Sequence, residues 1–433
     1  MAARPVASRL PGCPTATDTR IRAGLLVMLR CDQASTEEWV MEAKTLDGLL
    51  ERAVGDRVVP GVVAMVGDRD GVLYEGGFGA LSVGGDARVQ GDTVFWLASM
   101  TKAIVSVAAL QMIEQQKLEL EQPVADILPA FGALQVLEGF DGDSPRLRPP
   151  ARQATIRQLL THTAGAGYWF ANPDLLRYHQ LTGIPDPGTC KLAALFEVPL
   201  IADPGTRWEY GTNTDWLGLV VQEVSGQDLA TFCSEHIFAP LGMRDATFTA
   251  TATQASRTMA VHARLPGGGL VPTSFGLPTD AEFYSAGAGA SGTALDYIRF
   301  LRALLRDGEL DGERVLAPET VKLAFTDHLE GAPLPAKMTS ALPELTNDVP
   351  SWPYAQGWGL GFRLVLEDVP EMRRAGTGDW AGLANCYYWI DRATGIVGVF
   401  LTQVLPFFDA PIVETALGFE HAVYASVGAS ATT

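Results

Sequence analysis

The stretch Phe95-Trp96-Leu97-Ala98-Ser99-Met100-Thr101-Lys102 decides how the rest of the chain is interpreted. It is typical of an extended segment that runs into a helix. The residues that follow, up to Ile113, are apolar on almost every side, which predicts a helix buried in a large core. Ser99 and Lys102 are three residues apart, so they share a helix face and their side chains can touch.

This Ser–Lys pair has the parts of an activated nucleophile. Burying a lysine is costly without partners, and an amine in a poorly solvated site can act as a base rather than a cation. The open N-terminus of the helix offers N–H groups and positive dipole charge to a developing anion. The pattern therefore favours a serine nucleophile at Ser99. S-x-x-K alone is a pattern that chance could supply.

Composition narrows the class of protein. Of 433 residues, 47% are hydrophobic and 19% charged, which is typical of a globular chain with a sizeable core. The balance of 32 basic and 50 acidic residues gives a net charge of −18. This charge argues against nucleic-acid partners and against anionic membranes. No run reaches the roughly 20 apolar residues of a membrane span.

Five cysteines are scattered along the chain without a C-x-x-C pair, which argues against a disulfide framework and a zinc site. A cytoplasmic location fits this pattern better than a periplasmic or secreted one. Residues 1–40 are expected to be a poorly ordered extension. The apolar run from Ala23 to Leu29 is at the lower limit for a signal segment, and no small-residue cleavage site follows it.

Strand patterns occur near both ends of the chain, with helical patterns between them. Hairpins are predicted from the turn signals at residues 68–71 and 391–395, and a further strand over Gly359–Leu366. Helices are expected over residues 42–54, 156–162, 216–224, 229–238, 294–305 and 412–424. The predicted fold class is α+β, with one antiparallel sheet flanked by terminal helices. Residues 41–115 and 285–433 would form the sheet domain, and residues 116–284 a mainly helical insert.

Two later stretches could supply partners for Ser99. Tyr210, in PGTRWEYGTNTDWLG, follows a turn and precedes a helix, so its side chain can project into a cleft. An ordinary half-buried aromatic is the alternative. The small residues of Gly378–Asn385 (GDWAGLAN) would let an acyl group approach a backbone N–H closely. A turn before an edge strand is the alternative there.

Taken together, these stretches resemble the serine β-lactamase and penicillin-binding-protein superfamily. The resemblance is strongest to its class C-like branch, which holds the family VIII carboxylesterases and the statin side-chain acyltransferases. It runs from about Leu46 to Tyr424. The stretches that carry it are LASMTK, VLEGFDGD, IRQLLTHTAG, PGTRWEYGTNTDWLG, FAPLGM, GTALDYIRF, GWGLGF and NCYYWID.

The resemblance implies a role for each matching residue. Ser99 would be acylated, with Lys102 hydrogen-bonded to it. Tyr210 would act with Lys102 as general base and then as acid toward the leaving alcohol. The N–H groups of Ser99 and Leu383 would form the oxyanion hole. No metal and no cofactor are implied.

Two departures from the family pattern bear on the substrate. Where β-lactamases and DD-peptidases carry K-T-G, this chain has Trp380-Ala381-Gly382, so the cation that binds a β-lactam carboxylate is missing. The second motif is usually Y-x-N, whereas here Thr212 stands two residues after Tyr210 and Asn213 follows it. Both changes favour a neutral ester over an anionic peptide-like substrate. Pocket positions are expected at Tyr168, Trp169, Asn213 and Asp215.

Two other patterns are expected to be structural. Gly287–Gly292 fits G-x-G-x-x-G but follows no convincing strand, so a helix-capping turn is favoured over a dinucleotide site; in the family this stretch borders the active site. His162 suggests a Ser-His-Asp triad, but the chain has no G-x-S-x-G elbow.

The predicted function is that of a serine carboxylesterase acting on short- to medium-chain acyl esters. An acyltransferase on the same residues is the first alternative and a β-lactamase or DD-peptidase the second. A catalytically dead binding module is disfavoured, because Ser99, Lys102 and Tyr210 are all present. The expected partner is a small-molecule ester, and the oligomeric state is left open.

Overall fold

A computed structural model describes residues 43–278 and 280–430, of which residues 46–430 lie in one compact unit. The predicted extension over residues 1–40 lies outside the described residues. Within residues 43–278 and 280–430, no helix is long and apolar enough to cross a membrane.

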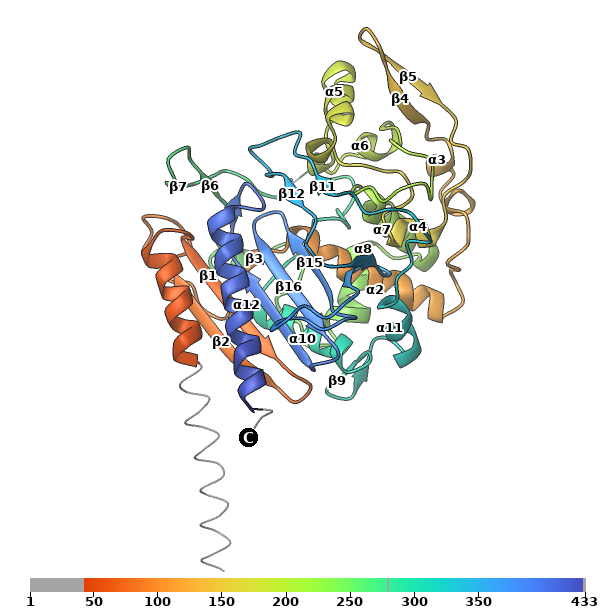
Figure 1. Ribbon diagram of the computed structural model, residues 1–433. Coiled ribbons are helices and arrows are strands. Elements are labelled where there is room, and N and C mark those ends of the chain that lie inside the picture. Colours follow the sequence, from red (N-terminus) through yellow and green to blue (C-terminus); the bar gives the residue numbers. More distant parts are fainter. Residues whose placement is uncertain (1–42, 279, 431–433) are drawn as a thin grey trace, which may run out of the picture. The chain divides into compact units, whose positions relative to one another are not determined.

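The central element is a seven-stranded antiparallel sheet built from both ends of the chain (Figure 1). The predicted hairpins are confirmed, because β1 (Gly61–Gly67) pairs with β2 (Val72–Gly79) and β16 (Cys386–Asp391) pairs with β17 (Ile396–Leu401). The pairing of β1 with β17 joins the two ends of the chain. The turn between β16 and β17 is held by Asp391, whose carboxylate accepts bonds from two backbone N–H groups. In sheet order the strands are β13 (Gln356–Trp358), β14 (Arg363–Val365), β15 (Gly378–Gly382), β16 (Cys386–Asp391), β17 (Ile396–Leu401), β1 (Gly61–Gly67) and β2 (Val72–Gly79).

The predicted single strand over Gly359–Leu366 is wrong, because the chain turns there between β13 and β14. Gly361 has a φ of +101°, and a Cβ at this position would lie 2.2 Å from the Ser106 hydroxyl oxygen. A left-handed residue this close to α2 ends the strand and forces a tight turn.

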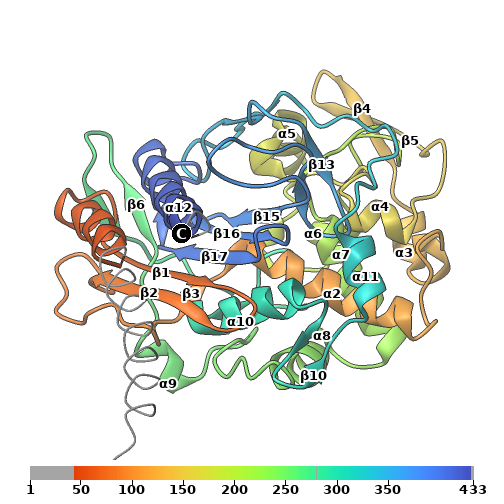
Figure 2. The same cartoon turned by 60° about the horizontal axis from the view of Figure 1, so that its bottom comes forward.

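Helices cover both faces of the sheet. Figure 2 shows α12 on one face and α10 on the other, where α10 packs against β1, β16 and β17. The long helices are α2 (Thr101–Glu114), α5 (Pro173–Thr182), α7 (Asn213–Ser225), α10 (Ala294–Leu305) and α12 (Ala410–Ser430), and residues 43–55 are also helical. Shorter helices are α3 (Pro129–Gly132), α4 (Ile156–Leu160), α6 (Ala193–Phe196), α8 (Leu229–Cys233), α9 (Ala252–Ala255) and α11 (Pro318–Ala324).

Residues 116–284 carry α5, α7 and several short helices together with two small hairpins. The hairpin strands are β4 (Val136–Asp141) with β5 (Ser144–Arg148), and β6 (His262–Arg264) with β7 (Leu270–Pro272). The predicted helix over residues 229–238 is α8 followed by a π-helical turn over Ser234–Phe238. The division of the chain into a sheet domain and a helical insert stays a prediction. The antiparallel sheet with its helices confirms the predicted α+β class.

Four further short strand pairs lie outside the main sheet. They are β3 (Phe95–Trp96) with β8 (Ser291–Gly292), β9 (Glu309–Leu310) with β10 (Glu313–Arg314), β11 (Lys337–Met338) with β12 (Val349–Pro350), and β18 (Val404–Leu405) with β6. The first pair positions the start of α2, and β11–β12 lies over the site end of β15.

Candidate active site

Ser99 lies in a sharp turn between β3 and α2. The turn is a short 3₁₀ segment, Ala98–Met100, fixed by hydrogen bonds from Leu97 N to Ala290 O and from Met100 N to Leu97 O. Ala98 is fully buried and has a φ of +48°, a left-handed conformation that L-residues rarely adopt. Such outliers concentrate at functional sites, where the surrounding structure holds them in place.

Lys102, in the first turn of α2, is 2% exposed and directs its amine at Ser99. Its Nζ donates hydrogen bonds to Ser99 Oγ at 3.2 Å, Tyr168 Oη at 3.1 Å and Gly287 O at 2.8 Å. Its hydrogen bonds in the described part of the chain thus go to uncharged oxygens, and no ion pair with a carboxylate forms there. These three contacts fix the amine where a proton from the serine would have to go.

Tyr168 connects the amine to a buried carboxylate. Its hydroxyl donates to Asp215 Oδ2 at 3.4 Å, while Asp215 Oδ1 accepts from Ser285 Oγ at 2.8 Å and from Gly287 N at 2.9 Å. Burial, and then the negative charge of Asp215, raise the pKa of Tyr168 well above its ordinary value. Tyr168 therefore stays protonated and orients Lys102 rather than accepting its proton.

Tyr210 lies against the same amine in a different way. The face of its ring is 4.8 Å from Lys102 Nζ, and its hydroxyl oxygen accepts a hydrogen bond from Trp380 Nε1 at 3.1 Å. Tyr210 thus meets Lys102 through a cation–π contact, whereas the tyrosine that accepts a hydrogen bond from the amine is Tyr168. Sequence reasoning placed Tyr168 only in the pocket wall, and no local signal marked it as a partner of the amine.

The third predicted stretch reaches the nucleophile from β15. Gly382 ends this strand, and a Cβ there would lie 2.5 Å from Leu97 O, so only glycine lets the strand approach the Ser99 turn. Leu383 follows in the turn and lines the same cavity as Ser99. The backbone at Gly382 and Leu383 therefore lies beside the Ser99 turn.

Ser99 opens onto a cavity of about 440 Å³. This volume is within the range of about 300–1,000 Å³ for small-molecule sites. Its exposed walls are mainly apolar and aromatic, and the polar residues that line it include Asp186, Asp215 and Glu344. The predicted pocket residues Tyr168, Trp169 and Asp215 line it.

Asn213, predicted as a pocket residue, does not line this cavity. Its side chain is fully buried, and its amide nitrogen is 3.0 Å from both Ala166 O and His162 Nδ1. The extra residue between Tyr210 and Asn213 turns the amide into the protein. His162 packs against the Tyr210 ring at 5.1 Å, and burial and the Lys102 charge lower its pKa, so it is a neutral structural histidine.

Gly287 is a site residue whose role sequence reasoning did not identify. A Cβ here would lie 2.5 Å from Asp215 Oδ2 and 2.6 Å from Tyr168 Oη. The Gly-rich stretch thus brings a carbonyl to Lys102, and the predicted helix-capping turn is confirmed, with Thr293 as the cap of α10. Within residues 43–278 and 280–430, no group of His, Cys, Asp and Glu side chains is arranged to hold a metal ion.

Comparison with known proteins gives consistent matches. Residues 46–421 match the family model described as beta-lactamase. Monacolin J acid methylbutanoyltransferase of Aspergillus terreus is 33% identical over 398 residues, covering 88% of this chain and 95% of the relative. Lovastatin esterase of Penicillium rubens is 32% identical, covering 88% and 98%. A mutant of simvastatin synthase from Aspergillus terreus has a TM-score of 0.78 at 31% identity, covering 89% and 98%.

Proposed function

Because this chain belongs to the beta-lactamase family, whose similar members include named acyltransferases and an esterase, we propose that it cleaves carboxylic esters through an acyl-enzyme on Ser99. The observation that carries the proposal is the Lys102 amine, buried and 3.2 Å from Ser99 Oγ. In its neutral form, an amine held there receives the serine proton as the oxygen attacks the ester carbon.

The proton then has a defined route. The Ser99 proton passes to the neutral Lys102 amine, the Tyr210 hydroxyl gives its own proton to the leaving alcohol, and Lys102 then returns a proton to the Tyr210 phenolate. The N–H groups of Ser99 and Leu383 stabilise the oxyanion, a contribution of about 2.7–4 kcal/mol for one such donor. Water then attacks the acyl group by the reverse route.

The proposed substrate is a neutral ester with a short to medium acyl chain. Trp380 occupies the position of the lysine that would bind a β-lactam carboxylate, and its indole N–H is used by Tyr210. The mainly apolar cavity provides little to pair with an anionic substrate.

Acyl transfer is the second candidate. Monacolin J acid methylbutanoyltransferase is named for moving an acyl group to an acceptor, and this chain covers 95% of its length. On this chain an alcohol would replace water in the second step, with the same residues in the same roles.

The test compares initial rates on p-nitrophenyl butyrate and on a chromogenic cephalosporin. We expect the ester to be cleaved faster, and faster cephalosporin turnover would contradict the proposal. Adding an alcohol acceptor and looking for a new ester separates transfer from hydrolysis. Ser99→Ala should abolish turnover and the acyl adduct seen by intact mass, and an adduct surviving in that variant would place the nucleophile elsewhere.

A further inference from the structure

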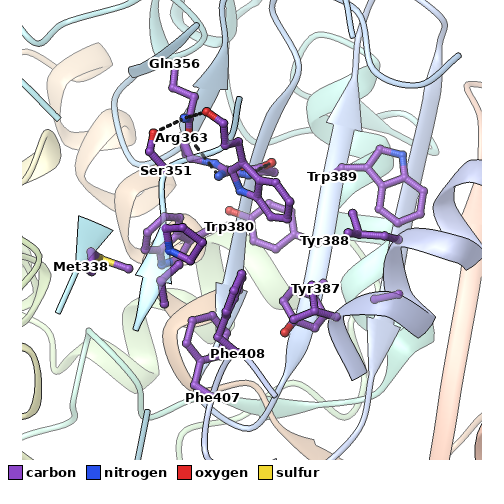
Figure 3. Close-up of a pocket in the computed structure, with 18 of the residues that line it drawn as sticks. Met338, Ser351, Gln356, Arg363, Trp380, Tyr387, Tyr388, Trp389, Phe407 and Phe408 are labelled. Atoms are coloured by element: carbon purple, nitrogen blue, oxygen red, sulfur yellow. Dashed lines mark hydrogen bonds and ion pairs between the residues drawn. The ribbon is translucent and has the colours of Figure 1, made fainter. Parts of the chain in front are cut away.

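A second cavity of about 130 Å³ adjoins the Ser99 cavity on the α12 face of the sheet. Ala381 of β15 and its cross-strand neighbour Tyr387 of β16 line it from the sheet, and Ala416 of α12 lines it from the helix. Figure 3 shows this chamber, with Met338 and Trp380 on one side, Tyr387 opposite, and Phe407 and Phe408 below. We refer to it below as the α12 chamber.

The α12 chamber and the Ser99 cavity share part of their lining, and we call these shared side chains the partition. The same five side chains line both spaces: Met338, Val349, Trp380, Ala381 and Phe407. Methionine is unbranched and has three rotatable side-chain bonds, so it is the most adaptable member of the partition. Met338 also lies on the two-residue strand β11, next to the loop that covers the site. A chain that passes from the Ser99 cavity into the α12 chamber would require this partition to open, and Met338 is the member best able to move aside.

The α12 chamber contains four charged groups that neutralise one another. Arg363 Nε donates to Asp379 Oδ1 at 2.7 Å, and Arg373 pairs with both Asp379 and Glu420. Two cations and two anions give no net charge, and their hydrogen bonds are directed at each other. Apart from Ser351 and Gln356, the remaining walls are aromatic and aliphatic, so an uncharged and mainly apolar group fits the chamber.

The site geometry decides which end of an ester faces the partition. In the proposed reaction Tyr210 protonates the leaving alcohol, so the alcohol oxygen must come within hydrogen-bonding reach of its hydroxyl. Trp380 donates to this same hydroxyl at 3.1 Å and is itself part of the partition. The alcohol side of the substrate therefore lies next to the α12 chamber.

We propose that the α12 chamber binds the apolar tail of the alcohol, an inference that rests on the proposed function. This alcohol is the leaving group in hydrolysis and the acceptor in acyl transfer. Each methylene that enters the chamber should raise kcat/KM about fourfold, the factor that corresponds to about 0.8 kcal/mol per buried CH₂. Two buried methylenes give about a 16-fold preference over an alcohol too short to reach the chamber.

The test uses Ala416→Phe, which fills the α12 chamber from the helix, on a residue that does not line the Ser99 cavity. Ala416→Leu fills it less and guards against a loss of folding. The matched control is Ala425→Phe, the same change at an exposed position of the same helix. For each protein, kcat/KM is measured by acid release from methyl butyrate, octyl butyrate and methyl octanoate, and with p-nitrophenyl butyrate.

We expect Ala416→Phe to lower the octyl-to-methyl butyrate ratio at least tenfold, and Ala416→Leu to lower it less. Cleavage of methyl butyrate, whose alcohol is too short to reach the chamber, should stay within twofold, and Ala425→Phe should match the wild type. An unchanged ratio in Ala416→Phe would overturn the inference, as would a loss confined to methyl octanoate, which would place the acyl chain in the chamber. If the wild type does not cleave p-nitrophenyl butyrate, the proposed function fails and this inference is withdrawn with it.

Discussion

Replacing Tyr168 or Tyr210 by phenylalanine removes one hydroxyl from the site, and the two losses should differ. In Tyr168→Phe, Lys102 loses one of three hydrogen-bond partners and keeps Ser99 Oγ and Gly287 O. A hydrogen bond to a charged group contributes about 1.5–3 kcal/mol, so kcat/KM should fall about 10- to 150-fold.

In Tyr210→Phe the proposed base and acid is lost. A general acid–base group contributes about 10²–10⁴ in rate. The change also leaves Trp380 Nε1 without its acceptor, which adds to the cost. Tyr210→Phe should therefore be the more damaging of the two variants.

The assay is kcat/KM for p-nitrophenyl butyrate across a pH series from about 6 to 10. Because burial and Asp215 hold the pKa of Tyr168 high, its removal should lower the profile without changing its shape. Tyr210→Phe should change the shape as well as the height. Tyr178→Phe is the matched control, since the Tyr178 hydroxyl bonds only Glu197 O in the helical region and does not line the cavity. A larger loss and an altered profile in Tyr168→Phe would refute the assignment and make Tyr168 the base.

Two further predictions concern the glycine that positions Lys102 and the pH dependence of the protein's stability. Gly287→Ala should lower kcat/KM at least about 100-fold, because the new Cβ would lie 2.5 Å from Asp215 Oδ2 and displace the carbonyl that holds Lys102. The control is Gly269→Ala, where the new Cβ meets open space and activity should equal that of the wild type. Hydrogen bonds from Arg148 lower the pKa of Asp203 from 3.8 to about 2, so this carboxylate stabilises the fold above about pH 4 and its contribution is lost as the pH falls toward 2. The Tm difference between wild type and Asp203→Asn should be present at pH 7 and shrink through that window, and a difference that persists at pH 2 would contradict the assignment.

The hairpins of the sheet could be predicted because each depends on residues that are close together in the sequence. The hairpin turn at Asp391 depends on one carboxylate that bonds N–H groups two and three residues ahead, which sequence alone can indicate. The break between β13 and β14 depends instead on Gly361 meeting Ser106 of α2, a contact between distant parts of the chain. A run of strand-forming residues contains no sign of such a contact, so the sequence predicted one strand.

The residues of the active site also differ in whether the sequence alone could bring them together. Ser99 and Lys102 lie three residues apart, and helix geometry alone places them within reach of each other. Tyr168 and Gly287 reach the amine from 66 and 185 residues away, so only the fold brings them together. Asn213 shows the converse: one extra residue after Tyr210 turned an expected pocket amide into a buried structural one.

Trp380 explains why the same Ser–Lys pair can serve a different substrate. A lysine here would place a cation beside Tyr210 and attract a carboxylate, whereas the indole supplies one neutral donor, 3.1 Å from the Tyr210 hydroxyl. The rest of the ring forms part of the partition to the α12 chamber, so one residue bears on both the proton route and the space for the alcohol. Replacing Trp380 would therefore change both the hydrogen bond to the Tyr210 hydroxyl and the wall of the α12 chamber.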